Sequence, residues 1–147
     1  MNKKLLLVLL SIIMLITFSS CKKEEEARKP ITPDSFEMVA ESVEYETKDV
    51  TENFKDNKKV LKAKVARVKN KYQIEYYTLE DAEFAKKMYD KNKKNFESQK
   101  ETKDKAEVKE TENYSEYKLS TRGKYKMLSK IDNTLMYADV DEQYKDN

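Results

Sequence analysis

The 147-residue chain has no histidine or tryptophan, one cysteine, one glycine and two prolines. Without histidine, neither a histidine-based catalytic triad nor a histidine metal site can form. A single glycine excludes the glycine-rich phosphate loop, the dinucleotide-binding fingerprint and the nucleophile elbow of hydrolases. One cysteine cannot form a disulfide within the chain. The usual devices of catalysis are therefore missing, and we expect no enzyme, no cofactor and no metal site.

Carboxylates, lysines and tyrosines are the groups left for acid–base chemistry. Glu75 and Glu116 are the acids on predicted strands that one sheet can bring together. Such a pair is usually solvated, so a small carboxylate-dependent envelope enzyme is only a minor alternative. Asp139, Asp141 and Glu142 resemble a calcium loop loosely, because the glycine and the final glutamate of an EF-hand are absent.

The first 21 residues have the three-part layout of a secretory signal. Lys3 and Lys4 form a short positive segment, and residues 5–18 form a mostly apolar run. This run fits the 7–15 residues of a signal peptide and is shorter than the roughly 20 residues that span a bilayer. Two small residues, Ser19 and Ser20, then precede Cys21.

The segment Phe18-Ser19-Ser20-Cys21 resembles the lipobox of bacterial lipoproteins, although Phe18 stands where that family usually has leucine. The resemblance implies that residues 1–20 are a lipoprotein signal peptide, cleaved before Cys21. It also implies a diacylglyceryl group on the Cys21 sulfur and usually an acyl group such as palmitate on the new amino group. Two or more acyl chains anchor a protein stably, so the expected location is the extracytoplasmic face of the cell membrane. An ordinary signal peptide with a chance cysteine is the alternative.

Residues 21–31 are predicted to be the lipidated cysteine and a charged tether. The whole chain has 30 basic and 28 acidic residues, and loss of Lys3 and Lys4 with the signal leaves 28 of each. Proteins that bind nucleic acids normally carry a basic excess on one face. We therefore expect the membrane as a partner, through the lipid on Cys21, and no nucleic acid.

Two helices are predicted in the rest of the chain. The first begins after Thr32, because a capping threonine precedes proline and an acid, and it ends near Tyr45. The second opens with the capping-box-like run Thr78-Leu79-Glu80-Asp81. Both are amphipathic, since their apolar residues recur with helical spacing. These residues are Phe36, Val39, Ala40 and Val43 in the first helix, and Ala82, Ala85, Met88, Tyr89 and Phe96 in the second.

Strands are predicted where apolar and polar residues alternate. Two begin near Val60 and Tyr72, with a turn at residues 69–71 between them. Three more fill residues 117–140, with turns at Gly123 and at Asp132-Asn133. Residues 46–57 are expected to be irregular, and residues near 97–113 to form a charged mobile loop.

These elements predict an α+β fold in the order α-β-β-α-β-β-β. Short connections favour antiparallel neighbours. We therefore expect a single antiparallel sheet of about five strands, with both helices on one face. Residues 32–147 would form this single small domain.

The ten tyrosines are the feature most open to a functional interpretation. On an exposed sheet face, a tyrosine offers apolar area and a polar hydroxyl to a glycan, peptide or protein. The simpler explanation is that tyrosine suits strands. The candidates for partner binding are Tyr76, Tyr77, Tyr117, Tyr125 and Tyr137.

The mature chain is similar to small uncharacterised lipoproteins of low-GC Gram-positive bacteria. The similarity lies in the Thr-x-Asp-x-Phe start at residues 32–36, the aromatic strand and acidic-capped helix at residues 76–84, and Asn133-Thr134-Leu135. We predict a membrane-anchored, non-enzymatic binding or accessory lipoprotein of the bacterial cell envelope, with an envelope protein or wall polymer as partner. The alternative is a carrier of a small apolar ligand or lipid, ranked second because a modest core leaves little room for a large cavity.

Overall fold

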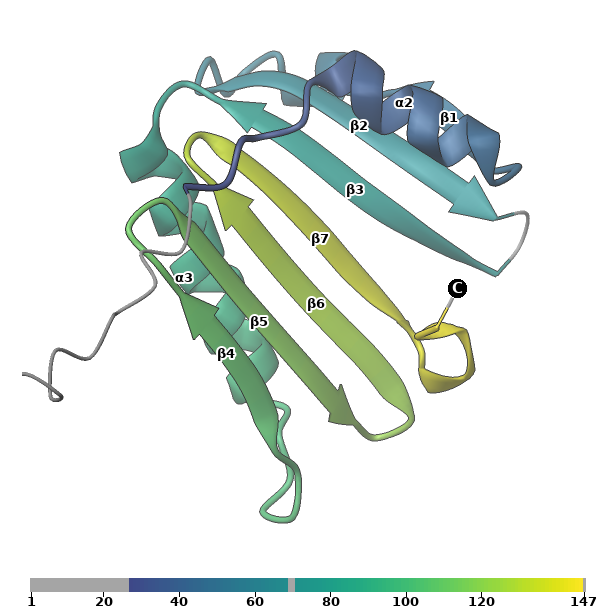
Figure 1. Ribbon diagram of the computed structural model, residues 1–147, viewed down its shortest axis with the longest axis vertical. Coiled ribbons are helices and arrows are strands. Elements are labelled where there is room, and N and C mark those ends of the chain that lie inside the picture. Colours follow the sequence, from purple (N-terminus) through teal and green to yellow (C-terminus); the bar gives the residue numbers. More distant parts are fainter. Residues whose placement is uncertain (1–26, 69–70, 147) are drawn as a thin grey trace, which may run out of the picture.

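The described part of the chain folds into one antiparallel sheet and two α-helices (Figure 1). The computed structural model describes residues 27–68 and 71–146, and within these ranges it is an α+β structure, as predicted. The expected signal peptide, Cys21 and residues 69–70 of the predicted turn lie outside the described residues. Beyond Asp141, a single turn of 3-10 helix, η2 (Glu142–Tyr144), closes the described chain.

The sheet has seven strands in the order β1-β2-β3-β7-β6-β5-β4. Every neighbouring pair is antiparallel. The strands are β1 (Glu46–Asp49), β2 (Val60–Val68), β3 (Tyr72–Leu79), β4 (Ala106–Glu110), β5 (Tyr114–Thr121), β6 (Lys124–Ile131) and β7 (Thr134–Asp141). Strands β1, β2 and β3 follow one another from one edge of the sheet to its middle. Strands β4 to β7 follow one another from the opposite edge inward, so that β7 pairs with β3 in the middle.

The prediction of about five strands was wrong because it missed both edge strands. The strand β1 lies in the segment expected to be irregular, and β4 lies in the segment expected to be a charged loop. Most of their side chains are exposed. An edge strand with little covered surface needs no alternation of apolar and polar residues, and charges on it discourage pairing with other chains.

The helices α2 (Pro33–Ser42) and α3 (Ala82–Glu97) lie on opposite faces of the sheet, and the prediction of one shared face was wrong (Figure 1). Adjacent strand residues point to opposite faces, and β3 uses both. Tyr76 stacks on Phe36 of α2, with ring centroids 5.1 Å apart, whereas Tyr77 packs in the cluster beneath α3. We name the two sides the α2 face and the α3 face.

The larger core lies between α3 and the sheet. Its buried members come from α3 and from five of the strands or their flanks. They are Val60, Ala63, Leu79, Ala85, Tyr89, Phe96, Tyr117, Leu119, Leu128 and Leu135. Val50 and Phe54 are partly buried and pack against this cluster. A smaller cluster lies under α2 and contains Phe36, Ala40, Ala66 and Tyr76.

Local signals set the helix ends. Thr32 caps α2 as predicted, and its Oγ1 accepts a hydrogen bond from the Ser35 amide at 3.1 Å. The helix ends at Ser42, short of the predicted Tyr45, because Glu44 adopts a left-handed conformation with φ 63°. The second helix begins later than predicted, since Asp81 is its N-cap and accepts from the Phe84 amide at 2.7 Å.

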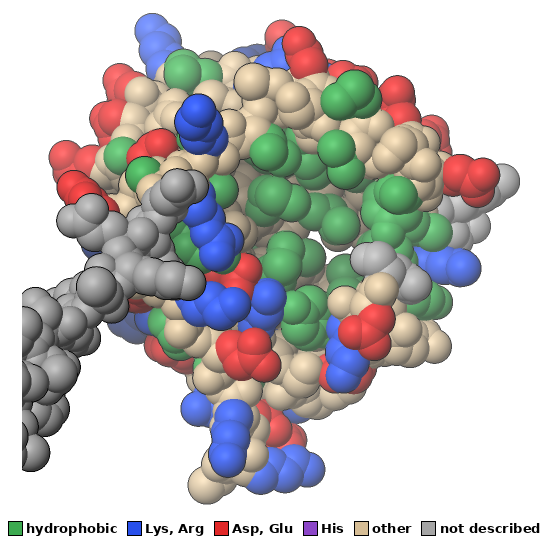
Figure 2. Space-filling model, viewed as in Figure 1, with side chains coloured by type: hydrophobic (Ala, Val, Ile, Leu, Met, Phe, Trp, Pro, Cys, Tyr) green, Lys and Arg blue, Asp and Glu red, His purple; other side chains and the backbone are tan. Residues whose placement is uncertain are grey.

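The segment before α2 crosses the α2 face of the sheet. The Arg28 guanidinium lies 3.7 Å from the ring centroid of Tyr114, and the Tyr76 hydroxyl donates to the Ile31 carbonyl at 2.7 Å. At the far end, Tyr144 packs against Tyr72 with ring centroids 5.0 Å apart. The segment before α2, the helix α2 and the turn η2 thus border the α2 face. Figure 2 shows hydrophobic side chains gathered in a hollow among them.

Candidate ligand-binding groove

The hollow on the α2 face contains an apolar chamber with a volume of about 410 Å³. Its walls come from α2, from the segment before it, and from strands β2, β3 and β7. The lining residues are Ile31, Phe36, Val39, Ala40, Val43, Tyr45, Ala66, Ile74 and Met136. Small-molecule sites typically measure about 300–1,000 Å³ and are mostly apolar, so the chamber has the size and character of one.

The chamber exists because α2 covers only part of the sheet. The helix makes its main contacts with β1, β2 and β3. Its predicted apolar stripe therefore divides: Phe36 and Ala40 are buried against the sheet, whereas Val39 and Val43 are 59% and 55% exposed. These two valines form the wall of the chamber that faces solvent.

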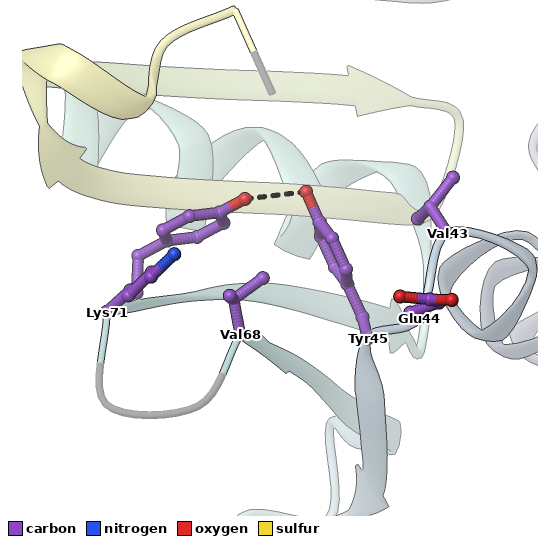
Figure 3. A pocket seen from close by; sticks show the side chains of 6 residues that line it. Val43, Glu44, Tyr45, Val68 and Lys71 are labelled. Atoms are coloured by element: carbon purple, nitrogen blue, oxygen red, sulfur yellow. Dashed lines mark hydrogen bonds between the residues drawn. The ribbon is translucent and has the colours of Figure 1, made fainter.

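A second pocket of about 380 Å³ lies next to the chamber, and Figure 3 shows the side chains that line it. It shares Val43 and Tyr45 with the chamber, so the two pockets adjoin at these residues. We call the second pocket the mouth and the whole the α2 groove. The mouth is lined by Val43, Glu44, Tyr45, Val68, Lys71 and Tyr72. Unlike the chamber, it carries one positive and one negative side chain.

The polar centre of the mouth is a pair of tyrosine hydroxyls. Those of Tyr45 and Tyr72 lie 2.6 Å apart, and the rings meet edge to face at 5.9 Å (Figure 3). Burial, and then the bond to Tyr45, raise the pKa of Tyr72 to about 12, so this hydroxyl stays neutral at physiological pH. One hydroxyl donates to the other, which leaves one proton of the pair for a further acceptor.

The structure does not gather the five predicted partner-binding tyrosines. Tyr76 and Tyr125 lie on the α2 face, whereas Tyr77, Tyr117 and Tyr137 lie on the α3 face. Tyr76 and Tyr117 are buried and offer no surface to a partner. Tyr77, Tyr125 and Tyr137 are half-buried. Partner binding by these three stays a prediction, although they form no common platform.

Glu75 and Glu116, the acids considered for catalysis, also lie on opposite faces. Glu75 accepts from Tyr77 at 2.5 Å, and Glu116 accepts from Tyr114 at 2.6 Å. The two carboxylates therefore do not converge. Among residues 27–68 and 71–146, no group of acids or cysteine is arranged to hold a metal ion.

Sequence reasoning missed the residues that form the groove's mouth. Tyr45 follows α2, whereas Lys71 and Tyr72 follow the turn between β2 and β3, 26 or more positions later in the chain. Only the arrangement of α2 over the end of this hairpin brings them together. The stripe of α2 was visible in the sequence, but its partial exposure depends on where the helix lies on the sheet.

Comparison with known proteins found no matching family model, no matching curated protein and no matching solved structure. In the part of the chain that the structure describes, no helix is long and apolar enough to cross a membrane.

Proposed function

We propose that this protein is a lipid-anchored, non-enzymatic binding protein of the bacterial cell envelope, and that its α2 groove binds a ligand with an apolar chain. The anchor is the expected lipid on Cys21, as the resemblance to a lipobox implies. The observation that carries the binding function is the open apolar chamber beside α2. This reverses the order of the sequence-based hypotheses and places a ligand carrier first.

Exposed aliphatic side chains around the chamber support this function. Ile31, Val39 and Val43 are 41%, 59% and 55% exposed, although each also lines the chamber. Contiguous exposed apolar surface commonly marks an interaction site. An alkyl chain lying along the groove would remove this surface from water, which contributes roughly 25 cal/mol for each Å² buried.

The shape of the surface favours a small ligand over a protein partner. A stable protein interface buries roughly 800 Å² on each partner. The exposed residues Ile31, Val39 and Val43 instead line a single groove, and the predicted tyrosine platform is divided between two faces. A narrow apolar groove suits an alkyl chain better than a broad protein surface.

Fluorescence of N-phenyl-1-naphthylamine, a neutral apolar probe, tests the groove. The mature chain (residues 21–147 with Cys21→Ser) contains every element of the described fold and carries no lipid. We expect saturable binding of the probe, and Val39→Lys should weaken it by about tenfold or more, because it replaces part of the apolar wall with a hydrated charged side chain. Met38→Lys is the matched control, since Met38 is the neighbouring residue on α2, is 66% exposed and does not line the chamber. No binding, or equal loss in both variants, would overturn the proposal.

Fractionation of cells tests the anchor separately. The wild-type protein should be found with the membrane and should incorporate a labelled fatty acid. Cys21→Ser should abolish labelling and release the protein from the membrane fraction. Unchanged membrane association of Cys21→Ser would show that the anchor is misassigned, whatever the groove binds.

A further inference from the structure

The α2 groove is apolar at one end and polar at the other. Only aliphatic and aromatic side chains line the chamber, whereas the mouth combines the Tyr45–Tyr72 hydroxyl pair with Lys71 and Glu44. Tyr45 lines both parts, so a ligand in the chamber that extends past this residue meets the hydroxyl pair. The groove is therefore complementary to a molecule with an apolar tail and a polar head.

The mouth offers hydrogen-bond donors to this head. One proton of the Tyr45–Tyr72 pair is free, because neither hydroxyl makes another hydrogen bond among the described residues. The Tyr72 ring packs against two other rings, those of Tyr45 and Tyr144, with ring centroids 5.9 Å and 5.0 Å away. A fixed hydroxyl donor is well suited to an anionic acceptor, which forms stronger hydrogen bonds than a neutral one.

The charge near the hydroxyl pair also favours an anion. Lys71 has no ion-pair partner in the described part of the chain, and its Nζ lies 5.9 Å from the ring centroid of Tyr144. In Figure 3, Lys71 and Glu44 lie on opposite sides of Tyr45, and the lysine amine points toward the dashed bond between the hydroxyls. A head placed at the hydroxyls on the Tyr72 side thus meets the positive charge and is separated by a ring from the negative one.

We propose that the ligand is a single-chain amphiphile with an anionic head, whose tail occupies the chamber and whose head contacts the Tyr45–Tyr72 pair and Lys71. Long-chain fatty acids and lysophospholipids share this chemistry. The chamber volume, near the lower end of the range for ligand sites, matches one chain rather than two. This inference rests on the proposed function and adds to it the class of ligand.

Competition against N-phenyl-1-naphthylamine tests the inference with two ligands that share one tail. Dodecanoate is anionic at neutral pH, and 1-dodecanol is its neutral analogue. We expect the mature chain to bind dodecanoate about tenfold more tightly, because a hydrogen bond to a charged group contributes more than one to a neutral group. A 12-carbon lysophosphatidylglycerol, included alongside, identifies the source of the head: tighter binding of it indicates a lysophospholipid, and tighter binding of dodecanoate indicates a free fatty acid.

Variants in the mouth should remove the preference for the anion and leave tail binding intact. Lys71→Met should weaken dodecanoate binding by about threefold, as expected for an exposed charge. The double variant Tyr45→Phe/Tyr72→Phe should weaken it by about tenfold, since it keeps both rings and removes both hydroxyls. Neither variant should change 1-dodecanol binding by more than about twofold. Lys58→Met, an exposed lysine far from the mouth residues in sequence and without an ion pair in the described chain, is the control.

The outcomes separate this inference from the proposed function. Equal affinity for dodecanoate and 1-dodecanol in the wild type, with no effect of the mouth variants, would overturn the anionic head and leave the apolar groove standing. Failure of both ligands to displace the probe would overturn the proposed function itself. An anion preference that survives in all mouth variants would show that the head lies elsewhere, and would also overturn the inference.

Discussion

The two helices carry the same kind of sequence pattern but play different parts in the fold. In α3, three of the five stripe residues, Ala85, Tyr89 and Phe96, are no more than 2% exposed, whereas Met88 is half-buried and Ala82, at the start of the helix, is exposed. In α2, two members of the stripe are buried, and Val39 and Val43 are more than half exposed. Apolar periodicity therefore identifies the face of a helix that avoids water, whereas the position of the helix on the sheet decides how much of that face is covered.

The position of each helix on the sheet explains this difference in burial. The helix α3 packs across β6, β7 and β3, near the middle of the sheet, so strands lie beneath Ala85, Tyr89 and Phe96. The helix α2 packs on β1, β2 and β3, and the flank nearest β7 borders the hollow. We infer that α3 serves mainly stability, and that α2 serves both stability and ligand binding.

Shortening one apolar side chain in the stripe of each helix should give the largest difference in the free energy of unfolding. Phe96→Ala is expected to lower the free energy of unfolding by about 3–5 kcal/mol, because it empties a fully buried site beneath α3. Val43→Ser, on the exposed side of the α2 stripe, should change it by no more than about 0.5 kcal/mol. Urea denaturation of the mature chain measures both. If Val43→Ser lowered the free energy of unfolding as much as Phe96→Ala does, the exposed side of the α2 stripe would be needed for stability, which would contradict the account.

A substitution just after the C-terminal end of α2 should make the protein more stable. Glu44 has φ 63°, a conformation that costs a residue with a side chain about 1 kcal/mol more than glycine. Glu44→Gly should therefore raise the free energy of unfolding by up to about 1 kcal/mol. Glu41→Gly, inside the same helix, should lower it by about 1 kcal/mol. Thermal unfolding of the two variants tests the sign, and destabilisation by both would mean that the left-handed residue is not strained.

Acid should weaken the contact between α2 and β2. Glu37 accepts a hydrogen bond from Lys64, which is buried beneath the helix, and this bond, followed by one from Thr47, holds the Glu37 pKa below its ordinary value of 4.5. A carboxyl group whose pKa is lower in the folded state contributes stability that is present above about pH 4.5 and is lost as pH falls through the folded pKa.

Glu37→Gln should therefore lower the melting temperature near neutral pH and reduce the further loss on acidification. Thermal unfolding from about pH 6 to about pH 3 measures this. Glu52→Gln is the control, because the Glu52 side chain makes no hydrogen bond or ion pair with the residues that the structure describes. If the melting temperatures of the wild type and Glu37→Gln fell in parallel with pH, the proposed contribution of the Glu37–Lys64 contact would be contradicted.

Much of the fold could be predicted from local signals. The Thr32 cap, the turn at Gly123 with φ 71°, and the five inner strands depend on residues close together in the sequence. The edge strands were missed because pairing on one side demands no apolar alternation. The opposite placement of the helices was missed because β3 buries residues on both faces, so that Tyr76 and Tyr77 serve different cores.

The candidate site was less predictable than the fold. Its chamber wall was recognised as the α2 stripe, but the mouth unites Tyr45 with Lys71 and Tyr72 through the packing of the helix against a distant hairpin. The tyrosines chosen from the sequence were those with strand spacing, and that spacing favours burial as readily as exposure. Burial depends on tertiary contacts that a single sequence does not reveal.

Nuclear Overhauser contacts between bound dodecanoate and isotope-labelled methionine methyl groups test the central claim most directly. Met136 lies in the floor of the α2 groove, and Met88 packs against the core beneath α3. We predict contacts from the chain methylenes of dodecanoate to Met136 and none to Met88. Contacts to Met88 without contacts to Met136 would place the ligand on the α3 face of the sheet. That result would contradict the division of roles between the two helices.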